Sequence, residues 1–435
     1  MLDIKFIREN PDILKEAVRK KHLDFDLDSF LALDQGRRSL LQEIEDLRAK
    51  QNILTEKIEK TADEYEKKSF LEMAKQIKER MAGREEEFKN KDIEWKKKML
   101  EIPNIPDAAV PEGITDAENI EIRQVGKIKV RQSQHYYLAK SSKLFKPKDH
   151  ISLMRDLNML DLERGAKVAG FRGYFLKNDA VLLSFALWNF VLEEFIKKGF
   201  EPLMAPSLVR PEGFFGTGWL PQGEEEVYKV QDNLYLTGTA EVPMMAFHQG
   251  EILEESDLPK KYIAFSPCFR REAGSYGKDT KGIFRIHEFF KIEQVILCKA
   301  DHEESVKWHE EITQNAEEIM QALDIPYRVV INCGGDLKLA NVKTYDIEAW
   351  IPSENRYRET HSSSYFHDFQ TRRLNVRYKD SEGKIRFAHS LNNTAIASPR
   401  ILIPLLENHQ KADGSAAIPA VLKKYMGKRS ISLRS

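Results

Sequence analysis

The strongest constraint on the fold is a stretch over residues 37–100 in which apolar side chains recur at alternating spacings of four and three. This heptad spacing is typical of a coiled coil and predicts helix throughout the stretch. Polar Gln51 fills one position of the seam. The apolar positions of the first half are Leu40, Ile44, Leu47, Leu54 and Ile58.

A polar segment at Thr61-Ala62-Asp63-Glu64 interrupts this pattern, and the same spacing then resumes. Two helices joined by so short a turn run antiparallel, each about 30 residues or roughly 45 Å long. Most of their charged surface has nothing of its own to pack on, so we expect a protruding arm. A solvated spacer or a dimerisation coil would show the same pattern. The positions of the second half are Phe70, Ala74, Ile77, Met81, Phe88 and Trp95.

Proline residues mark the end of the helical region. They predict a linker over residues 103–115, because proline sustains neither a helix nor a central strand. The sequence therefore divides into a helical domain (1–102), the linker, a larger domain (116–426) and a tail (427–435) that we expect to be exposed.

The larger domain mixes helices with short predicted strands. No GxGxxG or GxxxxGK[ST] motif occurs in it, which argues against a doubly wound nucleotide-binding fold. An antiparallel sheet flanked by helices is the natural alternative, so the whole chain is of the α+β class. The predicted strands include Leu234–Leu236, Val329–Asn332, Tyr345–Trp350 and Leu374–Tyr378.

Charge and hydropathy patterns exclude a secreted or membrane-spanning chain. The 435 residues carry 68 basic and 69 acidic side chains, a balance that still allows a local basic stripe for nucleic acid. Charged residues such as Asp3 and Lys5 occupy the first turns, unlike the apolar core of a secretory signal, so we expect a cytoplasmic protein. The longest apolar stretch, Ala180–Leu192, is too short to span a bilayer. We expect it to form a helix buried under the sheet.

The richest chemistry lies in one hairpin-sized segment. It contains Phe269-Arg270-Arg271-Glu272, a loop rich in Gly and Lys, then Arg285-Ile286-His287-Glu288-Phe289 and Glu293. An arginine can bind a pair of phosphate oxygens, a carboxylate can accept from an adenine amino group, and an aromatic ring can stack on a base. Alone, such a Phe-Arg-x-Glu motif is more often an ordinary strand and loop with surface charges.

Two flanking motifs change that interpretation. Upstream, Lys198–Pro206 closes a strongly apolar helix, and downstream Asn392-Asn393-Thr394 leads through Pro399-Arg400 into the apolar residues 401–403. In this order the three segments resemble the signature motifs of class II aminoacyl-tRNA synthetases. The segments at 237–241 (TGTAE) and 273–282 (AGSYGKDTKG) resemble bacterial-type seryl-tRNA synthetases in particular. The resemblance extends from residues 1–8 through 102–106 to 406–410.

This resemblance implies a two-step reaction on a class II fold. The carboxylate of L-serine attacks the α-phosphorus of ATP to give seryl-adenylate and pyrophosphate, and the 3′-terminal ribose of serine tRNA then takes the seryl group. Such catalysis depends on alignment and on neutralising charge at the α-phosphate. The resemblance also implies Mg²⁺ and a homodimer built around the segment near Pro206. It leaves open whether a selenocysteine tRNA is a further partner.

The resemblance assigns roles to matching positions. Arg270 and Arg400 are the expected catalytic residues; Glu272 would meet the adenine edge, Phe289 one face of the base, and Arg400 the other face or the γ-phosphate. The expected serine-binding residues are Thr239, Ala240, Glu241, Arg270, Glu293, Asn392 and Thr394. The expected ATP-binding residues are Arg270, Arg271, Glu272, Ile286, His287, Glu288, Phe289, Glu359, Thr360, His361, Ser362 and Arg400.

Two further sets follow from the same resemblance. Glu359 and Ser362 match the family's metal positions, and their oxygen atoms suit Mg²⁺, a hard cation. The helical arm is expected to contact the long variable arm of serine tRNA. Its candidate phosphate contacts are Lys57, Lys60, Lys67, Lys68, Lys75, Lys78 and Arg80.

One departure and two alternatives remain. Position 288 is Glu where the family pattern has Gln, and a carboxylate near a phosphate would weaken ATP binding because it cannot donate a hydrogen bond. A relative that loads an amino acid onto a carrier protein would share the motifs, but such relatives typically lack the arm. A non-enzymatic coiled-coil scaffold would have lost Arg270, Glu293 or Arg400, and all three are present.

Overall fold

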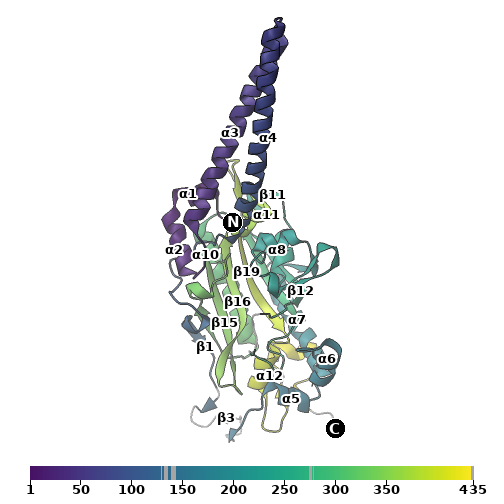
Figure 1. Cartoon of the computed structure of the whole chain (residues 1–435). Helices are drawn as coiled ribbons and strands as arrows, with labels where there is room; N and C mark the ends of the chain where they lie inside the picture. The colour runs from purple at the N-terminus through teal and green to yellow at the C-terminus, as the bar shows by residue number, and fades with distance from the viewer. Residues whose placement is uncertain (129, 132–135, 139–143, 274–276, 278, 433–435) are drawn as a thin grey trace. The chain divides into compact units, whose positions relative to one another are not determined.

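The computed structural model describes residues 1–128, 130–131, 136–138, 144–273, 277 and 279–432. The chain forms two compact units (Figure 1). We call the first, made of residues 3–19 and 23–103, the helical unit. The second, made of residues 1–2, 20–22 and 104–435, is the sheet unit.

The helical unit is dominated by two long antiparallel helices, α3 and α4, which confirms the predicted hairpin (Figure 1). They have 34 and 38 residues, longer than expected, and Thr61–Asp63 connects them. Side-chain caps fix where each helix begins, because Asp26 accepts from the Ser29 amide and Asp63 from the amides of the next turn. The unit's helices are α1 (Ile4–Glu9), α2 (Pro11–Lys20), α3 (Leu27–Lys60) and α4 (Glu64–Glu101).

A buried ion-pair network fastens the base of this hairpin. Asp34 is 1% exposed and accepts hydrogen bonds from Arg8 Nε at 2.7 Å and from Trp95 Nε1 at 3.0 Å. Arg37 pairs with Asp92 at 2.6 Å and lies 4.6 Å from the Trp95 ring centre. Burial alone would raise the pKa of Asp34, but the Arg8 guanidinium outweighs it and the pKa is lowered. The base of the hairpin is therefore tied to α1 as well as to itself.

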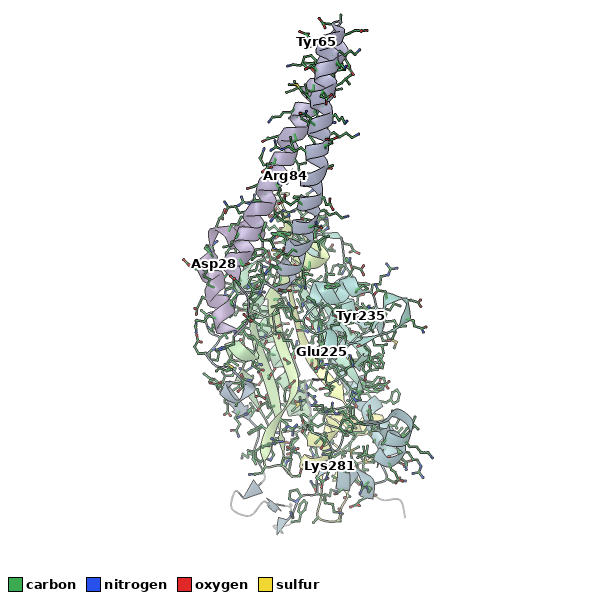
Figure 2. All side chains as sticks on the ribbon, viewed as in Figure 1. Asp28, Tyr65, Arg84, Glu225, Tyr235 and Lys281 are labelled. Carbon is green, nitrogen blue, oxygen red and sulfur yellow. The ribbon has the colours of Figure 1, made fainter. Side chains whose placement is uncertain are left out.

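Towards the turn of the hairpin the side chains point outward from the two helices (Figure 2). Tyr65, at the turn, is 86% exposed. The seam residues Leu54 and Ile58 are only partly buried there, whereas Leu40 and Ile44 near the base are buried. The outer half of the hairpin thus buries little apolar surface of its own.

The sheet unit is built on an eight-stranded sheet of order β1-β14-β15-β16-β19-β13-β12-β7. Neighbouring strands are antiparallel except β12 and β7, which confirms the expected antiparallel class. The strands are β1 (Ile120–Val125), β7 (Glu201–Met204), β12 (Lys260–Phe269), β13 (Glu288–Cys298), β14 (Tyr327–Ile331), β15 (Lys343–Ile351), β16 (Arg356–His367) and β19 (His389–Ser398).

Helix α10 (His302–Ala322) covers one face of the central strands. Gln294 on β13 donates to the Ile312 carbonyl at 2.9 Å, and His309 Nε2 contacts the Ser363 carbonyl on β16 at 2.9 Å. Because successive side chains on a strand point to opposite faces, Glu293 on β13 faces away from α10. The second face is therefore the one that receives the predicted site residues.

Helix α7 (Asp179–Lys197) contains the longest apolar stretch, and it is buried on one face only. Leu183 and Leu187 lie in the main hydrophobic core of the unit. Leu182 and Phe185, in contrast, are 51% and 56% exposed. The expectation of a fully buried helix is correct for half of its surface and wrong for the other half.

The remaining helices are α5 (His150–Asp156), α6 (Leu162–Ala169), α8 (Pro211–Thr217), α9 (Glu241–Ala246), α11 (Phe369–Leu374), α12 (Leu402–His409) and α13 (Lys423–Met426). Short strands complete the unit: β2 (Val130–Arg131), β3 (Tyr136–Leu138), β4 (Leu144–Phe145), β5 (Leu160–Asp161), β6 (Phe175–Leu176), β8 (Leu208–Val209), β9 (Tyr228–Lys229), β10 (Tyr235–Leu236), β11 (Ile252–Glu254), β17 (Arg377–Lys379), β18 (Ile385–Phe387), β20 (Ala416–Ala417) and β21 (Ser430–Ile431).

Two expectations are corrected at this level. The strand predicted from Leu374 starts at Arg377, because Leu374 ends α11. The tail is not wholly exposed, since β21 pairs with β20 and Ile431 is buried. Residues 433–435 of the tail and 274–276 and 278 of the Gly-rich loop lie outside the described residues. Over the rest of the chain, no helix has both the length and the apolar character needed to cross a membrane.

Candidate active site

A cavity of about 600 Å³ opens on the sheet face opposite α10. Strands β13, β16 and β19 and the segments that follow β10 and β12 provide much of its wall. It brings together most of the residues predicted from the sequence. Those that line it are Thr239, Glu241, Arg270, Glu272, Ile286, Phe289, Glu293, Glu359, Thr360, Ser362, Asn392, Thr394 and Arg400.

Five predicted residues do not line the cavity. Ala240 and His361 are buried, Arg271 and Glu288 are exposed, and His287 is half-buried. The backbone of His287 supports Arg270, since the Arg270 amide donates to the His287 carbonyl at 2.9 Å. The ligand roles of all five stay predictions, and the unexpected carboxylate at position 288 does not face the cavity.

Glu293 is the centre of one end of the cavity. It is 1% exposed, and its carboxylate accepts from Lys291 Nζ at 2.7 Å, Asn392 Nδ2 at 2.9 Å and the Glu241 amide at 3.0 Å. The Thr239 hydroxyl also donates to it at 2.5 Å. Burial alone would raise the pKa of Glu293, but the adjacent Lys291 ammonium outweighs that effect and the pKa is lowered. The carboxylate is therefore held charged and fixed in position.

Glu241 is the second buried carboxylate at this end. Its Oε1 accepts from Gln370 Nε2 at 2.6 Å, and Gln370 Oε1 in turn accepts from the Ser390 hydroxyl at 2.8 Å. Burial, and then the charge of Glu293, raise the pKa of Glu241. Two carboxylates, one ammonium and several hydroxyl and amide groups thus line a small polar pocket. Such a pocket suits a small zwitterion that carries a hydrogen-bonding side chain.

Arg270 stands beside this pocket at the end of β12. Its Nε donates to the Gly238 carbonyl at 3.1 Å, and its Cζ lies 5.3 Å from the Phe289 ring centre and 5.6 Å from the Trp219 ring centre. Among the described residues it has no carboxylate within 4 Å. The terminal nitrogens of this guanidinium therefore have no protein counter-ion.

Arg400 lies at another part of the cavity wall, against Phe284. Its Cζ is 4.6 Å from the Phe284 ring centre, its Nε donates to the Phe284 carbonyl at 3.2 Å, and its Nη1 is 3.7 Å from Glu359 Oε1. Arg358 contacts the same ring at 3.7 Å. Two guanidinium groups thus contact the Phe284 ring, and the bonds of Arg400 to the Phe284 carbonyl and towards Glu359 fix its position.

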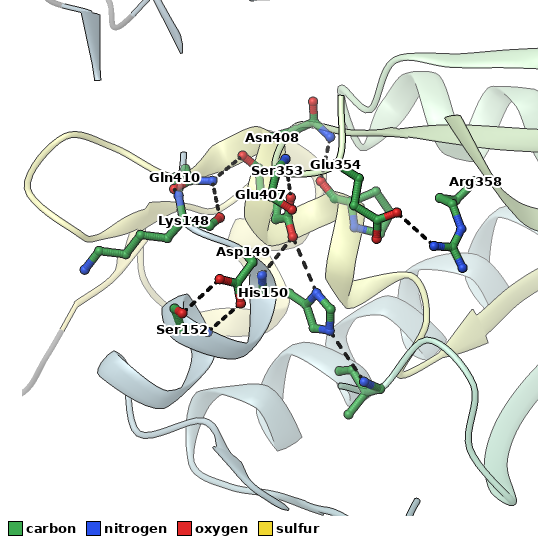
Figure 3. Close-up of polar contacts among 12 residues, drawn as sticks. Lys148, Asp149, His150, Ser152, Ser353, Glu354, Arg358, Glu407, Asn408 and Gln410 are labelled. Atoms are coloured by element: carbon green, nitrogen blue, oxygen red, sulfur yellow. Dashed lines mark hydrogen bonds and ion pairs between the residues drawn. The ribbon is translucent and has the colours of Figure 1, made fainter. Parts of the chain in front are cut away.

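A buried network outside the cavity supports the loop that carries Phe284 (Figure 3). Glu407 on α12 is fully buried and accepts from the amides of His150 at 2.8 Å and Ser353 at 2.9 Å. Its Oε1 also lies 3.5 Å from His150 Nδ1, and the other ring nitrogen of His150 is 3.5 Å from the Ile283 amide. The carboxylate therefore links α12, α5 and the loop before Phe284.

The proposed metal ligands share one face because of a β-bulge. Glu359 and Ser362 are three residues apart, which on a regular strand would place them on opposite faces. The register between β15 and β16 shifts by one residue at Thr360, and both side chains line the cavity as a result. Burial, and then the charge of Glu359, raise the pKa of the neighbouring Asp346 to about 8.

The donor chemistry of Glu359 and Ser362 fits a magnesium ion that completes its shell with phosphate oxygens and water. Within the described residues, no group of three or more His, Cys, Asp or Glu side chains is arranged to hold a metal by itself. A cation here would therefore depend on a phosphate-bearing ligand.

Several cavity residues were missed by sequence reasoning. Lys291 had a signal, because it lies two positions before Glu293 on a strand and must share its face. Trp219 and Lys338 come from loops, where no periodicity indicates which side chain faces inward. Gln370, which binds Glu241 without lining the cavity, comes from the short helix α11 and was missed for the same reason. In the helical unit, all seven predicted tRNA-contacting side chains are exposed.

Comparisons with known proteins agree with this site. Residues 226–409 match the family described as tRNA synthetase class II core domain (G, H, P, S and T), and residues 1–106 match the seryl-tRNA synthetase N-terminal domain. A serine-tRNA ligase of Deinococcus radiodurans is 44% identical over 99% of both chains. That of Pyrococcus abyssi is 43% identical over 99% of this chain and 97% of its own.

Solved structures give the same result for the fold. A crystal structure of seryl-tRNA synthetase from Pyrococcus horikoshii complexed with ATP has a TM-score of 0.91 at 40% identity and covers 100% of both chains. A cytoplasmic serine-tRNA ligase from Naegleria fowleri in complex with AMP has a TM-score of 0.86 at 35% identity, covering 100% of this chain and 99% of its own. With its two domain matches and its full-length relatives, this chain belongs to the seryl-tRNA synthetase family.

Proposed function

We propose that this chain is a serine-tRNA ligase, which activates L-serine with ATP and transfers the seryl group to the 3′-terminal ribose of serine tRNA. The observation that carries the proposal is the buried Glu293 with its partners Thr239, Lys291 and Asn392, next to an arginine without a counter-ion. The names of the full-length relatives agree with it.

In the first step, the polar pocket would hold serine. The carboxylates of Glu293 and Glu241 are suited to its ammonium and hydroxyl, and Thr394 offers a further hydroxyl. Arg270 would bind the serine carboxylate and the α-phosphate together, bringing the attacking oxygen to phosphorus and balancing the charge that develops there. Alanine would leave the buried polar groups unpaired, so we expect serine to be preferred by up to about 10⁴-fold.

The nucleotide would occupy the wider part of the cavity. Phe289 offers a ring face to adenine, Arg400 offers a planar cation to the other face or to the γ-phosphate, and Glu272 can accept from the adenine amino group. Glu359 and Ser362 would hold Mg²⁺. When bound, that ion supplies positive charge to the phosphates and orients them.

In the second step, the helical unit would provide the affinity for tRNA. Its exposed lysines can contact phosphates, whose repeated negative charge favours such side chains. Serine tRNA is the proposed substrate, and a charging assay with selenocysteine tRNA would test the further partner. The reaction needs cytoplasmic tRNA and ATP, so we place the enzyme in the cytoplasm.

We also propose that the functional enzyme is a homodimer. The exposed face of α7 and the strands after it carry an apolar surface that a soluble monomer would not be expected to leave open. It includes Leu182, Phe185, Met204 and Leu208, each more than half exposed. Sedimentation equilibrium should give twice the chain mass, and Phe185→Asp should lower it to that of one chain.

The decisive experiment is serine-dependent exchange of pyrophosphate into ATP with purified protein and Mg²⁺. We expect exchange with L-serine alone among the standard amino acids, and charging once serine tRNA is added. Arg270→Ala should reduce exchange by roughly 10²–10³-fold, because it removes the cation at the α-phosphate. The exposed Arg429→Ala is the matched control and should change nothing. Normal exchange by Arg270→Ala would refute the assignment of this site.

A further inference from the structure

A second cation without a counter-ion lies beside Arg270. Lys338 lines the cavity, and its Nζ is 4.8 Å from the ring centre of Trp219, the same indole that Arg270 approaches at 5.6 Å. In the part of the chain that the structure describes, no carboxylate lies within 4 Å of Lys338 Nζ. Two like charges gathered on one indole ring, with no carboxylate of the described residues within 4 Å of either, form a site for an anionic ligand.

The backbone that carries Lys338 is held firmly from behind. Lys21 is 2% exposed, and its Nζ donates to the carbonyls of Lys338 at 3.0 Å, Leu339 at 2.9 Å and Asn341 at 2.7 Å. Asn104 adds two bonds, from its amide to the Leu339 carbonyl at 2.9 Å and from Nδ2 to the Ala340 carbonyl at 2.9 Å. The backbone of segment 338–341 is therefore a fixed wall from which the Lys338 side chain extends.

The charged surroundings of Lys338 indicate which ligand it meets. Burial and the charge of Arg270 lower the pKa of Lys338, and Lys291 lowers it further, whereas Glu241 at the serine end and Glu359 at the proposed metal end raise it. Lys338 thus lies between the amino-acid pocket and the position proposed for the phosphate-bound cation. In the proposed reaction, the group that must lie between those two is the α-phosphate.

We propose that Lys338 is a further substrate-contacting residue of serine activation, whose ammonium binds a non-bridging oxygen of the α-phosphate together with Arg270. The inference rests on the proposed function. A serine carboxylate oxygen forms the new bond to the α-phosphorus, the bond from phosphorus to the bridging oxygen breaks, and pyrophosphate leaves with the electron pair. Lys338 keeps its proton and offsets the negative charge that accumulates on the non-bridging oxygens. Lys21 and Asn104 act through it and are positioning residues.

The test compares Lys338→Met, which keeps the length and loses the charge, with Lys338→Arg, which keeps the charge. In serine-dependent pyrophosphate exchange with the full-length protein, we expect Lys338→Met to lower kcat by roughly 50–100-fold. The KM for serine should change less than about twofold, and Lys338→Arg should recover about a tenth or more of the lost rate. The exposed Lys411→Met is the control for loss of a lysine and should exchange like the wild type.

Each other outcome has a distinct meaning. An unchanged kcat in Lys338→Met would overturn the proposal. A rise in the KM for serine alone would overturn it too, because the ammonium would then contact the amino-acid carboxylate. Absence of exchange in the wild type would instead refute the proposed function, and the role of Lys338 in serine activation would fall with it.

The positioning residues provide an independent arm of the test. Asn104→Ala alone should lower kcat about 5–10-fold. Added to Lys338→Met it should have little further effect, because Asn104 acts by positioning the segment that carries Lys338. Full additivity of the two effects would contradict this coupling. Lys21→Met is the second variant, and its thermal unfolding midpoint separates loss of positioning from loss of the fold.

Discussion

At the residue scale, the proposed site depends on a buried lysine, Lys291, beside a buried carboxylate, Glu293. Glu293 lies among groups that would otherwise favour its neutral form, and the Lys291 ammonium at 2.7 Å keeps it ionised. Neither charge would be tolerated there alone, since an unpaired buried charge costs several kcal/mol. The pair therefore supplies the proposed serine pocket with a carboxylate that is held in place and stays charged near neutral pH.

We predict that Lys291→Met makes serine binding strongly dependent on pH. Without the ammonium, the pKa of Glu293 rises, so the carboxylate becomes neutral at pH values where the wild type is charged. Raising the pH deprotonates it again, and the KM for serine should therefore fall as pH rises in the variant. The KM profile in pyrophosphate exchange checks this. Parallel profiles for variant and wild type would show that Lys291 does not set the charge of Glu293.

At the scale of elements, the base of the α3–α4 hairpin depends on Asp34. We predict that Asp34→Asn lowers the free energy of unfolding of the helical unit by about 2–4 kcal/mol, because Arg8 loses its buried partner. The lowered pKa of Asp34 means that its contribution is present above its ordinary value of 3.8 and is lost as pH falls below it. Urea unfolding followed by far-ultraviolet circular dichroism measures both effects. The exposed Asp63, which caps the N-terminus of α4, gives a matched Asp→Asn control, because the Asn side chain can still accept from the first amides of the helix.

The outer half of the hairpin should be dispensable for chemistry and essential for tRNA. Removing residues 45–58 and 66–79 deletes two heptads from each helix, which keeps the seam in register and retains the turn and the base network. We expect serine-dependent exchange to stay within twofold of the wild type and kcat/KM for tRNA charging to fall by about 100-fold or more. Unimpaired charging by the shortened protein would show that the outer half of the hairpin does not contribute to tRNA recognition.

A second variant separates charge from length. Replacing Lys57, Lys67, Lys68, Lys75 and Lys78 by Gln in the full-length chain keeps the arm and removes five of the six lysines that the deletion removes. The five-lysine variant should have a lower kcat/KM for tRNA charging. That kcat/KM should also depend less on salt concentration, since fewer phosphate contacts release fewer counter-ions.

What the sequence could predict differs between elements for a physical reason. The hairpin was readable because heptad periodicity is local, and the motif residues around Arg270 were readable because their order resembles a known family. The wall at 338–341 was not, because it has no periodicity and is fixed by Lys21 and Asn104, far away in sequence. The bulge at Thr360, which decides the face of Glu359, arises from strand pairing and has no local signature either.

At the scale of the whole molecule, buried histidines should limit stability in acid. Burial lowers the pKa of His309 to about 3 and that of His367 to about 3, from an ordinary value of about 6.5. The unfolded chain takes up protons that the folded protein excludes, so stability falls as pH drops from about 6.5 towards 3. Two such groups give about 2–3 kcal/mol per pH unit between pH 6 and 4.

We predict that His309→Asn flattens this dependence by about 1.4 kcal/mol per pH unit. The variant also loses the contact with the Ser363 carbonyl, so it should be less stable than the wild type at pH 7 and approach it at pH 5. The free energy of unfolding as a function of pH measures the slope, with the exposed His22→Asn as control. An unchanged slope in His309→Asn would assign the acid sensitivity to other groups.

Lys21 and Asn104 lie beside the two ends of residues 23–103, the longer of the two segments of the helical unit, and both bind segment 338–341. Exit and entry points that lie this close together are the geometry of a domain insertion. A lineage could gain, exchange or discard such a module in one recombination event, without rethreading any strand of the sheet. Because the same junction holds segment 338–341, a poorly matched graft should disturb that segment first, so successful chimeras should preserve Lys21 and Asn104.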